Sequence, residues 1–472
     1  APQRHALRAI AFACLCVFAL FRFGGTARAT DPQLSIATVA GGGFNAPGDE
    51  DQATSADLAS SNGVALDVNG NLIVAETDGH RLRRVDWVTG IITTVAGTGT
   101  AGFSGDGGPA AAAELAGPSG VVVDSDGSII FADRDNHRIR RIDAATGIIN
   151  TIAGTGATGG AGDDGPAIGA QVDSPEHIAL DGAGNLLVSD STFNRVRRID
   201  RATGTISTIA GGGSGADGGS AIGAALLAPA GLATDVNGNL FIVERQGRRI
   251  RRVDAQTGLI ATVAGTGAAG YSGDGGLAAD ATLSAPQGLA IGVDGALFVA
   301  DTGNHVVRRI DATTGVITAF AGMGSAGFAG DGGAATDAML NGPIGLAISP
   351  VGGLYVADSG NEVVRRVGSA DVASADAGPD QTLEATSPAG AIVTLDGSAS
   401  SDPNGSALTY QWRDANGAVV GHTATLTLTV PLGTTSFSLS VTNGGQAATD
   451  TVGITVQDTT APALSVPADM VI

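Results

Sequence analysis

Six acidic residues recur at near-regular intervals and together could hold a metal ion. Each follows a short apolar run, and the set is Glu76, Asp133, Asp190, Glu244, Asp301 and Asp358. Under six-fold symmetry their carboxylates would form a ring, and carboxylate oxygens coordinate divalent cations. The structural alternative is that each acid accepts hydrogen bonds from backbone amides at a bend, which every copy would need. Because functional sites are usually asymmetric, the regular placement favours the structural interpretation.

Pairs of consecutive arginines recur with the same period. Their first members are 57, 57, 54, 57 and 57 residues apart. One arginine of each pair is expected to face between repeats and to bind carboxylates or carbonyls there. The first members are Arg83, Arg140, Arg197, Arg251, Arg308 and Arg365.

A third set of acids lies in Gly-rich connections that precede an Ala-rich segment, an apolar residue and a Pro. The acids are Asp106, Asp164, Asp217, Asp274 and Asp331, and the apolar residues include Leu115, Val172, Leu283 and Leu340. Carboxylates among glycines can form a calcium loop. Each connection offers only one or two carboxylates, which favours an Asp that caps a short helical turn, with the apolar residue filling the gap between repeats. We therefore expect no cofactor, with Ca²⁺ as the alternative.

All these charges belong to a repeat of four short strands. The copy at residues 119–154 reads SGVVVDSDGSIIFADRDNHRIRRIDAATGIINTIAG. Its predicted strands are 121–123, 128–132, 138–142 and 148–153. A two-residue turn, Asp126-Gly127, is expected between the first two strands, and a tight turn from Asp143 to Gly147 between the last two.

The ends of the repeat array are offset by one strand. Residues 345–367 contain three strands and no fourth, whereas residues 35–40 (SIATVA) form a fourth strand without a repeat of their own. Pairing the two closes a ring. The predicted fold is all-β: a six-bladed β-propeller with four-stranded blades, in which the N-terminal strand closes the last blade.

The segments Asp133-Arg-Asp-Asn136-His137-Arg-Ile139 and Asp301-Thr-Gly-Asn304-His305-Val-Val307 carry an Asp, an Asn-His pair and an apolar strand. In this they resemble the NHL-repeat β-propellers, over about residues 35–367. Other copies depart from Asn-His, as at Gly79-His80 and Asn194-Arg195. The resemblance implies the propeller architecture and leaves the activity open, because one fold supports many functions.

Enzymatic propellers provide the strongest competing hypothesis. The amidating lyase of similar architecture uses several His at a central metal, but here the position before each first strand is mostly Gly, and only His177 departs from that rule. One His does not make a three-ligand metal site. There is also no G-x-S-x-G, P-loop or nucleophilic Cys. We predict a non-enzymatic protein; the alternative is a metal-dependent lyase or lactonase with a site in the central channel.

Candidate binding residues are those that depart from the repeat on the face where the longer connections open. They are Arg134, Glu176, His177, Phe193, Arg245 and Gln246. Aromatic and Arg side chains without a repeated structural role are typical interface anchors. The alternative is neutral variation at exposed loop tips. Trp87 lies on the opposite face, where the hairpins are expected.

Residues 1–29 have the pattern of a secretory signal. Arg4 and Arg8 precede an apolar run at 9–21, and Ala27-Arg28-Ala29 is an A-x-A cleavage site. The run is shorter than the roughly 20 residues that span a bilayer. Both cysteines lie in it, so the mature chain would have none. Its formal charge would move from −21 to −25, which argues against nucleic acid or anionic membranes as partners.

The composition changes to Ala, Ser and Asp after residue 367, and alternating short strands follow. Leu395-Asp-Gly-Ser398, Ser401-Asp-Pro-Asn-Gly405 and Tyr410-Gln-Trp412 resemble the PKD family of Ig-like β-sandwiches, with Trp412 as the core tryptophan. Residues 458–472 resemble the first strand of a hyalin-repeat (HYR) domain. The expected organisation is a signal peptide at 1–29, a propeller at 30–372, a sandwich at 373–457 and an HYR start at 458–472. We expect a secreted or cell-surface protein that binds a protein, peptide or glycan.

Overall fold

The computed structural model describes residues 34–44, 47–350, 352–369, 373–402, 408–442 and 447–460. The predicted signal peptide and most of the predicted HYR segment lie outside these ranges. Within them the chain is all-β, with strands and short 3-10 helices, as predicted. No helix in the described ranges has the length and apolar character of a membrane span.

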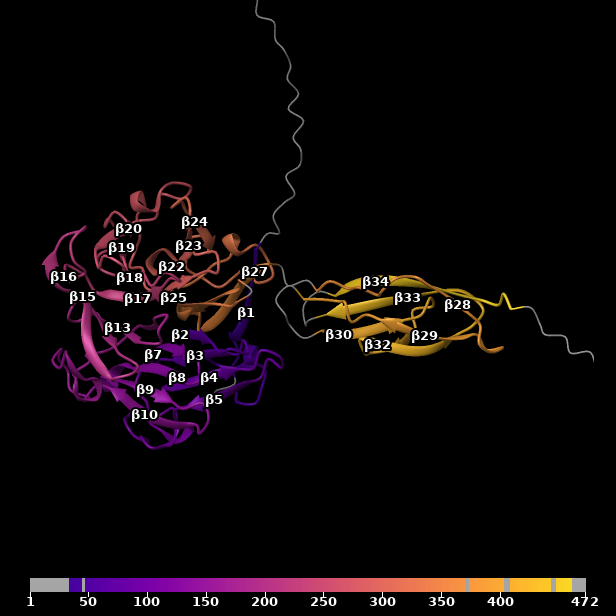
Figure 1. The fold of residues 1–472 in the computed structure, drawn as a ribbon, viewed down its shortest axis with the longest axis horizontal. Helices are drawn as coiled ribbons and strands as arrows, with labels where there is room; N and C mark the ends of the chain where they lie inside the picture. Colours follow the sequence, from indigo (N-terminus) through magenta and orange to yellow (C-terminus); the bar gives the residue numbers. More distant parts are fainter. Residues whose placement is uncertain are drawn as a thin grey trace, which may run out of the picture.

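Six antiparallel sheets, called blades one to six in chain order, form the first part of the chain (Figure 1). Blade one contains β2 (Ser61–Leu66), β3 (Leu72–Glu76), β4 (Arg81–Val85) and β5 (Ile92–Ala96), and blade two contains β7 (Pro118–Val123), β8 (Ile129–Asp133), β9 (Arg138–Ile142) and β10 (Ile148–Ala153). Blade three contains β12 (Ile178–Leu180), β13 (Leu186–Asp190), β14 (Arg195–Ile199) and β15 (Thr205–Gly215), and blade four contains β17 (Pro229–Thr234), β18 (Leu240–Glu244), β19 (Arg249–Val253) and β20 (Ile260–Ala264). Blade five contains β21 (Leu289–Ile291), β22 (Leu297–Asp301), β23 (Val306–Ile310) and β24 (Ile317–Ala321). Blade six contains β25 (Pro343–Ile348), β26 (Leu354–Asp358), β27 (Val363–Ser369) and the N-terminal β1 (Leu34–Gly41).

The ring closes as the offset predicts. Strand β1 pairs antiparallel with β27, with Ile36 opposite Val367 and Ala40 opposite Val364, and Figure 1 shows the two strands side by side. The innermost strands also contact one another in the cyclic order β2, β7, β12, β17, β21, β25 and back to β2. Every blade therefore has two neighbours, and the inner strands surround a central channel.

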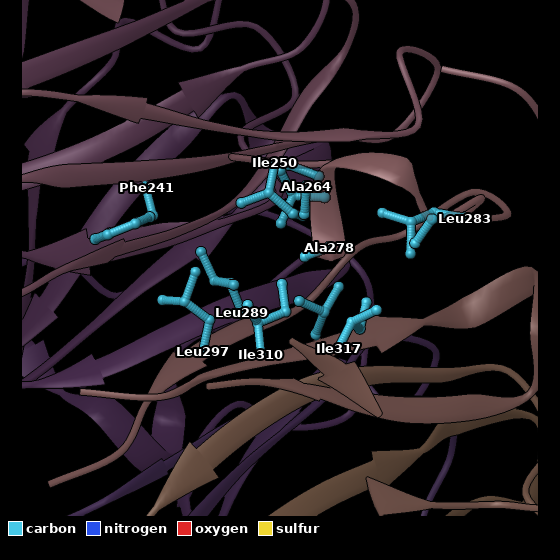
Figure 2. Packing of buried hydrophobic residues seen from close by; sticks show 13 residues of the cluster. Phe241, Ile250, Ala264, Ala278, Leu283, Leu289, Leu297, Ile310 and Ile317 are labelled. Carbon is cyan, nitrogen blue, oxygen red and sulfur yellow. The ribbon is translucent and has the colours of Figure 1, made fainter. Parts of the chain in front are cut away.

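Apolar side chains from neighbouring blades make the core. Between blades four and five, Phe241 and Ile250 pack with Leu289, Leu297 and Ile310 (Figure 2). The apolar residue predicted to fill the gap between repeats is buried in this way, since Leu115, Val172, Leu283 and Leu340 are at most 1% exposed. Each apolar cluster of the ring contains residues from two neighbouring blades. The core therefore forms only when the blades pack against one another.

One arginine of each pair, the first, is buried and binds carboxylates, as predicted. It bridges two acids in every blade but the third, where Arg197 pairs with Asp163 and Arg195 pairs with Asp190. In blade two, Arg140 is 0% exposed and bonds Asp106 at 2.8 Å and Asp133 at 3.4 Å, together with the carbonyls of Ser104 and Glu114. The capping interpretation of the loop acids is wrong, because no side-chain cap bond occurs at the 3-10 helices that follow: η2 (Ala110–Ala112), η4 (Ala167–Gly169), η5 (Ala278–Asp280) and η7 (Ala335–Asp337). The acids instead neutralise the buried guanidinium groups.

Blade three corrects one assignment. Asp163, and not Asp164, bonds the Arg197 guanidinium at 2.8 Å. Asp164 has φ +63°, close to the +81° of Gly107 at the equivalent place in the preceding connection.

A similar correction applies to the first hairpin of blade two. Its amide and carbonyl pairings join Asp124 to Gly127 and to Ser128, so the loop has three residues and not two.

Five of the six regularly spaced acids accept a backbone amide, as the structural interpretation predicts, whereas Glu76 bonds the Arg83 guanidinium. Asp133 accepts a bond from the amide of Ala116 at 2.8 Å, Asp301 from Ser284 at 2.7 Å and Asp358 from Asn341 at 2.6 Å. These amides lie 17 residues upstream, in the connection that leads into the blade. The His of the Asn-His signature also joins segments, because the Nδ1 of His305 accepts the amide of Gly342 in the next connection.

Burial makes two of these acids unusually hard to ionise. It raises the pKa of Asp301 and of Asp358 from 3.8 to about 6. The folded protein thus holds these protons more tightly than the unfolded chain, and each group lowers the free energy of unfolding as the pH rises from about 4 to about 6. We compare the free energy of unfolding in urea of the wild type with that of D358N. The wild-type value minus the D358N value is expected to fall by about 2 kcal/mol between pH 4.5 and pH 7.

A matched control is D311N in an exposed turn. Hydrogen bonds from Thr314 and its neighbour hold the pKa of Asp311 at about 2, so this carboxylate is ionised throughout the same interval. The difference between wild type and D311N should stay constant from pH 4.5 to pH 7. A constant difference for D358N as well would show that Asp358 does not titrate there.

The second part of the chain is a β-sandwich, as predicted. One sheet contains β28 (Gln381–Glu384), β34 (Ala448–Gln457), β33 (Gly433–Thr442), β30 (Thr409–Arg413) and β31 (Val419–Gly421), and the other contains β29 (Ala391–Asp396) and β32 (Thr425–Val430). Trp412 is 0% exposed in the core between them, and its indole N–H donates to the carbonyl of Thr423 at 3.0 Å. The prediction of a core tryptophan is confirmed.

Candidate ligand site at the mouth of the central channel

The inner strands leave a channel of about 370 Å³ at the centre of the ring. Five blades have Gly near the start of the innermost strand, at positions 63, 120, 231, 288 and 345. A Cβ at these positions would lie within 2.7 Å of a backbone oxygen of the next blade. The glycines thus let neighbouring inner strands approach closely. Blade three has His177 there, as the sequence shows.

A pocket of about 220 Å³ lies at one end of this channel and shares lining residues with it. Four of the six candidate residues line it: Arg134, Glu176, His177 and Arg245. They come from three blades, because Arg134 follows β8, Glu176 and His177 precede β12, and Arg245 follows β18. The fold brings together side chains that are up to 111 residues apart in the sequence.

Two arginines, each paired with one carboxylate, set the charge of this pocket. Arg245 pairs with Glu176 at 3.3 Å, with side chains 33% and 25% exposed. Arg134 is held by its neighbour Asp135 at 2.8 Å, and this hydrogen bond raises the pKa of Arg134. Burial lowers the pKa of His177, which is therefore neutral at pH 7. The pocket offers guanidinium donors and one neutral imidazole on a protein of net charge −21.

The other two candidates lie outside the pocket. Phe193 is 41% exposed and packs beside the guanidinium of Arg195, whose carbon is 5.5 Å from the ring centre. Gln246 is exposed next to Arg245. They can contact a ligand only if it extends over the rim of blades three and four. Trp87 lies at the hairpin end of blade one, against Gly70.

Sequence reasoning missed four residues that also line the pocket. They are Asn62, Ser119, Gln287 and Ile344. Each immediately precedes the inner-strand Gly of its blade, as Glu176 precedes His177. A comparison of the six repeats at the position before the inner-strand Gly would have found these residues. The Gly is nearly constant, whereas the residue before it changes from blade to blade. Some are already engaged: Asn62 donates to Thr77 at 2.8 Å, and Ser119 donates to the carbonyl of Pro175 at 3.2 Å.

The described residues contain no group of three or more His, Cys, Asp or Glu side chains placed to hold a metal ion. At the mouth, the nearest approach to a ligand set is His177 with Glu176, and Glu176 is already paired with Arg245. This arrangement suits hydrogen bonding and charge pairing with a ligand.

Comparison with known proteins matches two segments of the chain to known domain families. The Teneurin NHL domain family matches residues 99–160, and a PKD domain family matches residues 377–456. The chain contains an NHL domain and a PKD-like domain. The matched segment of the NHL domain includes β7 to β10, the blade that carries Asp133, Asn136 and His137.

Several proteins are similar to the NHL domain. Protein SUPPRESSOR OF QUENCHING 1, chloroplastic, of Arabidopsis thaliana is 30% identical over 54% of this chain and 25% of its own length. NHL repeat-containing protein 2 of Bos taurus is 29% identical over 55% of this chain and 40% of its own, and Teneurin-1 of Mus musculus is 33% identical over 44% and 8%. The chain thus spans less than half of the length of these relatives.

Solved structures agree on the fold. A structural genomics protein of unknown function from Bacteroides thetaiotaomicron has a TM-score of 0.53 at 19% identity, covering 71% of this chain and 75% of its own. An auxiliary nutrient binding protein from the same species has a TM-score of 0.52 at 16% identity, covering 71% and 76%. At these identities the likeness shows the fold alone.

Proposed function

We propose that this chain is a secreted or cell-surface recognition protein whose NHL propeller binds a protein, peptide or glycan at the channel mouth. The observation that carries this proposal is the convergence of Arg134, Glu176, His177 and Arg245, from three blades, on one pocket. His177 replaces the inner-strand Gly of the other blades, and the two arginines stand where the other four blades have Thr or Ser. NHL propellers generally mediate protein interactions, which favours a protein or peptide over a glycan.

The hydrogen-bond donors of the pocket indicate which part of the ligand enters it. Each of the two guanidinium groups already pairs with one carboxylate, Arg245 with Glu176 and Arg134 with Asp135, and each keeps further N–H donors. Arginine forks bind carboxylates through two hydrogen bonds. An acidic side chain or a carboxylate of the ligand is therefore the group that we expect beside Arg134 and Arg245, with His177 as a neutral partner.

The ligand can be captured with one engineered cysteine, because a chain that begins at residue 30 has none of its own. A photoreactive label on Gln246→Cys would lie on the rim beside Arg245. The matched control is the same label on Val88→Cys, because Val88 is 68% exposed at the hairpin end of blade one. A ligand that binds at the mouth is cross-linked by the label at position 246 and not by the label at position 88.

Affinity measurements then test the individual residues. Glu176→Ala, His177→Ala, Phe193→Ala and Arg245→Ala are each expected to weaken binding by up to tenfold, about 1.4 kcal/mol. Trp87→Ala, at the hairpin end, should leave the affinity unchanged. Effects should be larger for Arg245, which lines the pocket, than for Phe193, which lies outside it. Full affinity in all four variants would place the site elsewhere, with the PKD-like domain as the next candidate.

We also propose that the pocket is not catalytic. Among the described residues that line the mouth there is one His and one carboxylate, Glu176, and this carboxylate is paired with Arg245. Assays for lyase, lactonase and glycosidase turnover, with and without added divalent metals, should give background rates. Metal-dependent turnover that His177→Ala abolishes would overturn this and favour the enzymatic alternative.

A further inference from the structure

The second arginine of the blade-six pair differs from its five counterparts. In blades one to five this arginine pairs with an acid of its own blade, as in Arg84–Asp67 at 3.3 Å, Arg252–Asp254 at 3.0 Å and Arg309–Asp294 at 2.6 Å. Arg366 forms no ion pair with any carboxylate that the structure describes. Its Nε and Nη2 atoms are buried and have no hydrogen-bond partner among the described residues. Arg366 is also only 7% exposed.

The sequence explains the missing partners. The acid that follows the third strand in blades one to five is replaced by Gly368 in blade six, and the acid or Gly before the first hairpin is replaced by Ser349. A third change places Gly353 where four other blades have Asn or Ser and blade five has Ala. The guanidinium lies directly against Gly353 and Gly368, where added Cβ atoms would be 2.9–3.4 Å from its atoms. Blade six therefore contains the second arginine of the repeat without the acids that pair with it in the other blades.

A pocket of about 480 Å³ opens beside this guanidinium, between blade six and blade one. Trp87 and Tyr355 line it, with Arg366, Leu72, Val85 and the outward side of β1. The Arg366 guanidinium carbon is 5.7 Å from the centre of the Trp87 ring, and the rings of Trp87 and Tyr355 meet edge to face at 6.2 Å. An apolar and aromatic enclosure with one charged group is the usual form of a small-molecule site, and this volume is within the usual range.

The acid that lines this pocket does not neutralise Arg366. Asp86 lies in the turn after β4, and its Oδ1 accepts bonds from Val88 N, Thr89 N and Thr89 Oγ1. These bonds hold the pKa of Asp86 below the ordinary value. No atom of Asp86 forms a salt bridge with Arg366. The buried guanidinium therefore keeps its capacity to bind an external anion.

We propose that this pocket binds a small organic carboxylate with an apolar or aromatic body. The carboxylate would pair with the side of the Arg366 guanidinium that lines the pocket, because no described protein carboxylate forms an ion pair with this cation. The apolar body would lie against Trp87 and Tyr355. This site is separate from the channel mouth, because the two pockets share no lining residue, and it does not depend on the function proposed for the mouth.

The test uses 3-phenylpropionate as the probe and the neutral 3-phenylpropan-1-ol as its analogue. Trp87 is a built-in reporter, because the only other tryptophan, Trp412, is 0% exposed in the sandwich core. Titration of the full chain, followed by tryptophan fluorescence and by calorimetry, should show saturable binding of the acid. The alcohol should bind at least about tenfold more weakly, since it cannot form the charged pair. Equal binding of the two, or no saturable signal at millimolar acid, would overturn the proposal.

Three variants locate the charge. Arg366→Gln should weaken binding of the acid by about tenfold or more and remove its preference over the alcohol. Arg309→Gln, at the equivalent and acid-paired position of blade five, should bind like the wild type. Gly368→Asp restores the acid that blade five has as Asp311, and Gly368 has no positive φ that would oppose it. This internal carboxylate should abolish binding and raise the melting temperature. Unchanged binding in Arg366→Gln or in Gly368→Asp would contradict the site.

Discussion

A chain that lacks residues 30–43 is expected to melt far below the full-length protein and to aggregate. The deletion removes β1, so blade six loses its outer strand and β27 gains an unpaired edge. It also removes Ile36 and Ala40, both 0% exposed, and loss of one such Ile side chain costs about 2–5 kcal/mol by itself. Thermal unfolding followed by circular dichroism, with light scattering, measures both effects. A truncated chain that melts like the parent would refute the closure by β1.

Two point variants separate the role of the strand from the effect of a shorter chain. Ile36→Asp places a charge in the core between blades five and six, and it should reproduce most of the loss. Ala37→Asp, at the next position, puts the same charge on the exposed side of β1, opposite Arg366, and should not lower the stability. Alternating side chains on a strand point to opposite faces, so only the first variant disturbs the core.

Replacement of Arg140 by Met is expected to destabilise the propeller by about 3–5 kcal/mol. The substitution leaves the buried carboxylate of Asp133 without its cation, since Arg140 bonds both Asp133 and Asp106 and is itself 0% exposed. It also frees the carbonyls of Ser104 and Glu114. The measurement is the free energy of unfolding in urea at pH 7, where the ordinary pKa of an Asp leaves it ionised in the unfolded chain.

The neighbouring Arg141 provides a matched control. Its pairs with Asp126 at 2.6 Å and Asp143 at 3.4 Å are on the surface, and its side chain is 29% exposed. Surface pairs contribute at most about 1 kcal/mol, so Arg141→Met should have a small effect that decreases with added salt. Equal losses for the two variants would mean that the buried network contributes no more than a surface pair.

The architecture was predictable because a repeat makes many independent observations of one unit. The spacing of Arg-Arg pairs and the one-strand offset of its ends predicted a ring closed by residues 35–40, and the observed strand is Leu34–Gly41. Two of the four strands of the copy at 119–154 have the predicted bounds, as β9 and β10. Local errors concerned single residues whose partner is distant. For example, Asp163 and not Asp164 bonds the guanidinium of Arg197, which is 34 residues away in the chain.

The candidate residues of the mouth were found one by one as departures from the repeat. The sequence alone could not show that Arg134, Glu176, His177 and Arg245 meet, because they lie on different blades. Nor could it exclude Phe193 and Gln246, which differ from the repeat just as clearly but lie on the rim. The residue before each inner-strand Gly was visible in the sequence, but it gained meaning only when the inner strands were placed around one channel.

Sequence by itself determined what repeats: the strands, the turns, the buried arginines and the order in which the ring closes. Each of these depends on spacing within about one repeat, and near-identical copies record that spacing six times. Tertiary structure alone decided what is unique to one place. The convergence at the mouth and the unpaired guanidinium of Arg366 beside Trp87 both join blades that are adjacent in space. Trp87 and Arg366 are 279 residues apart in the chain, and only the closure of the ring brings them into contact.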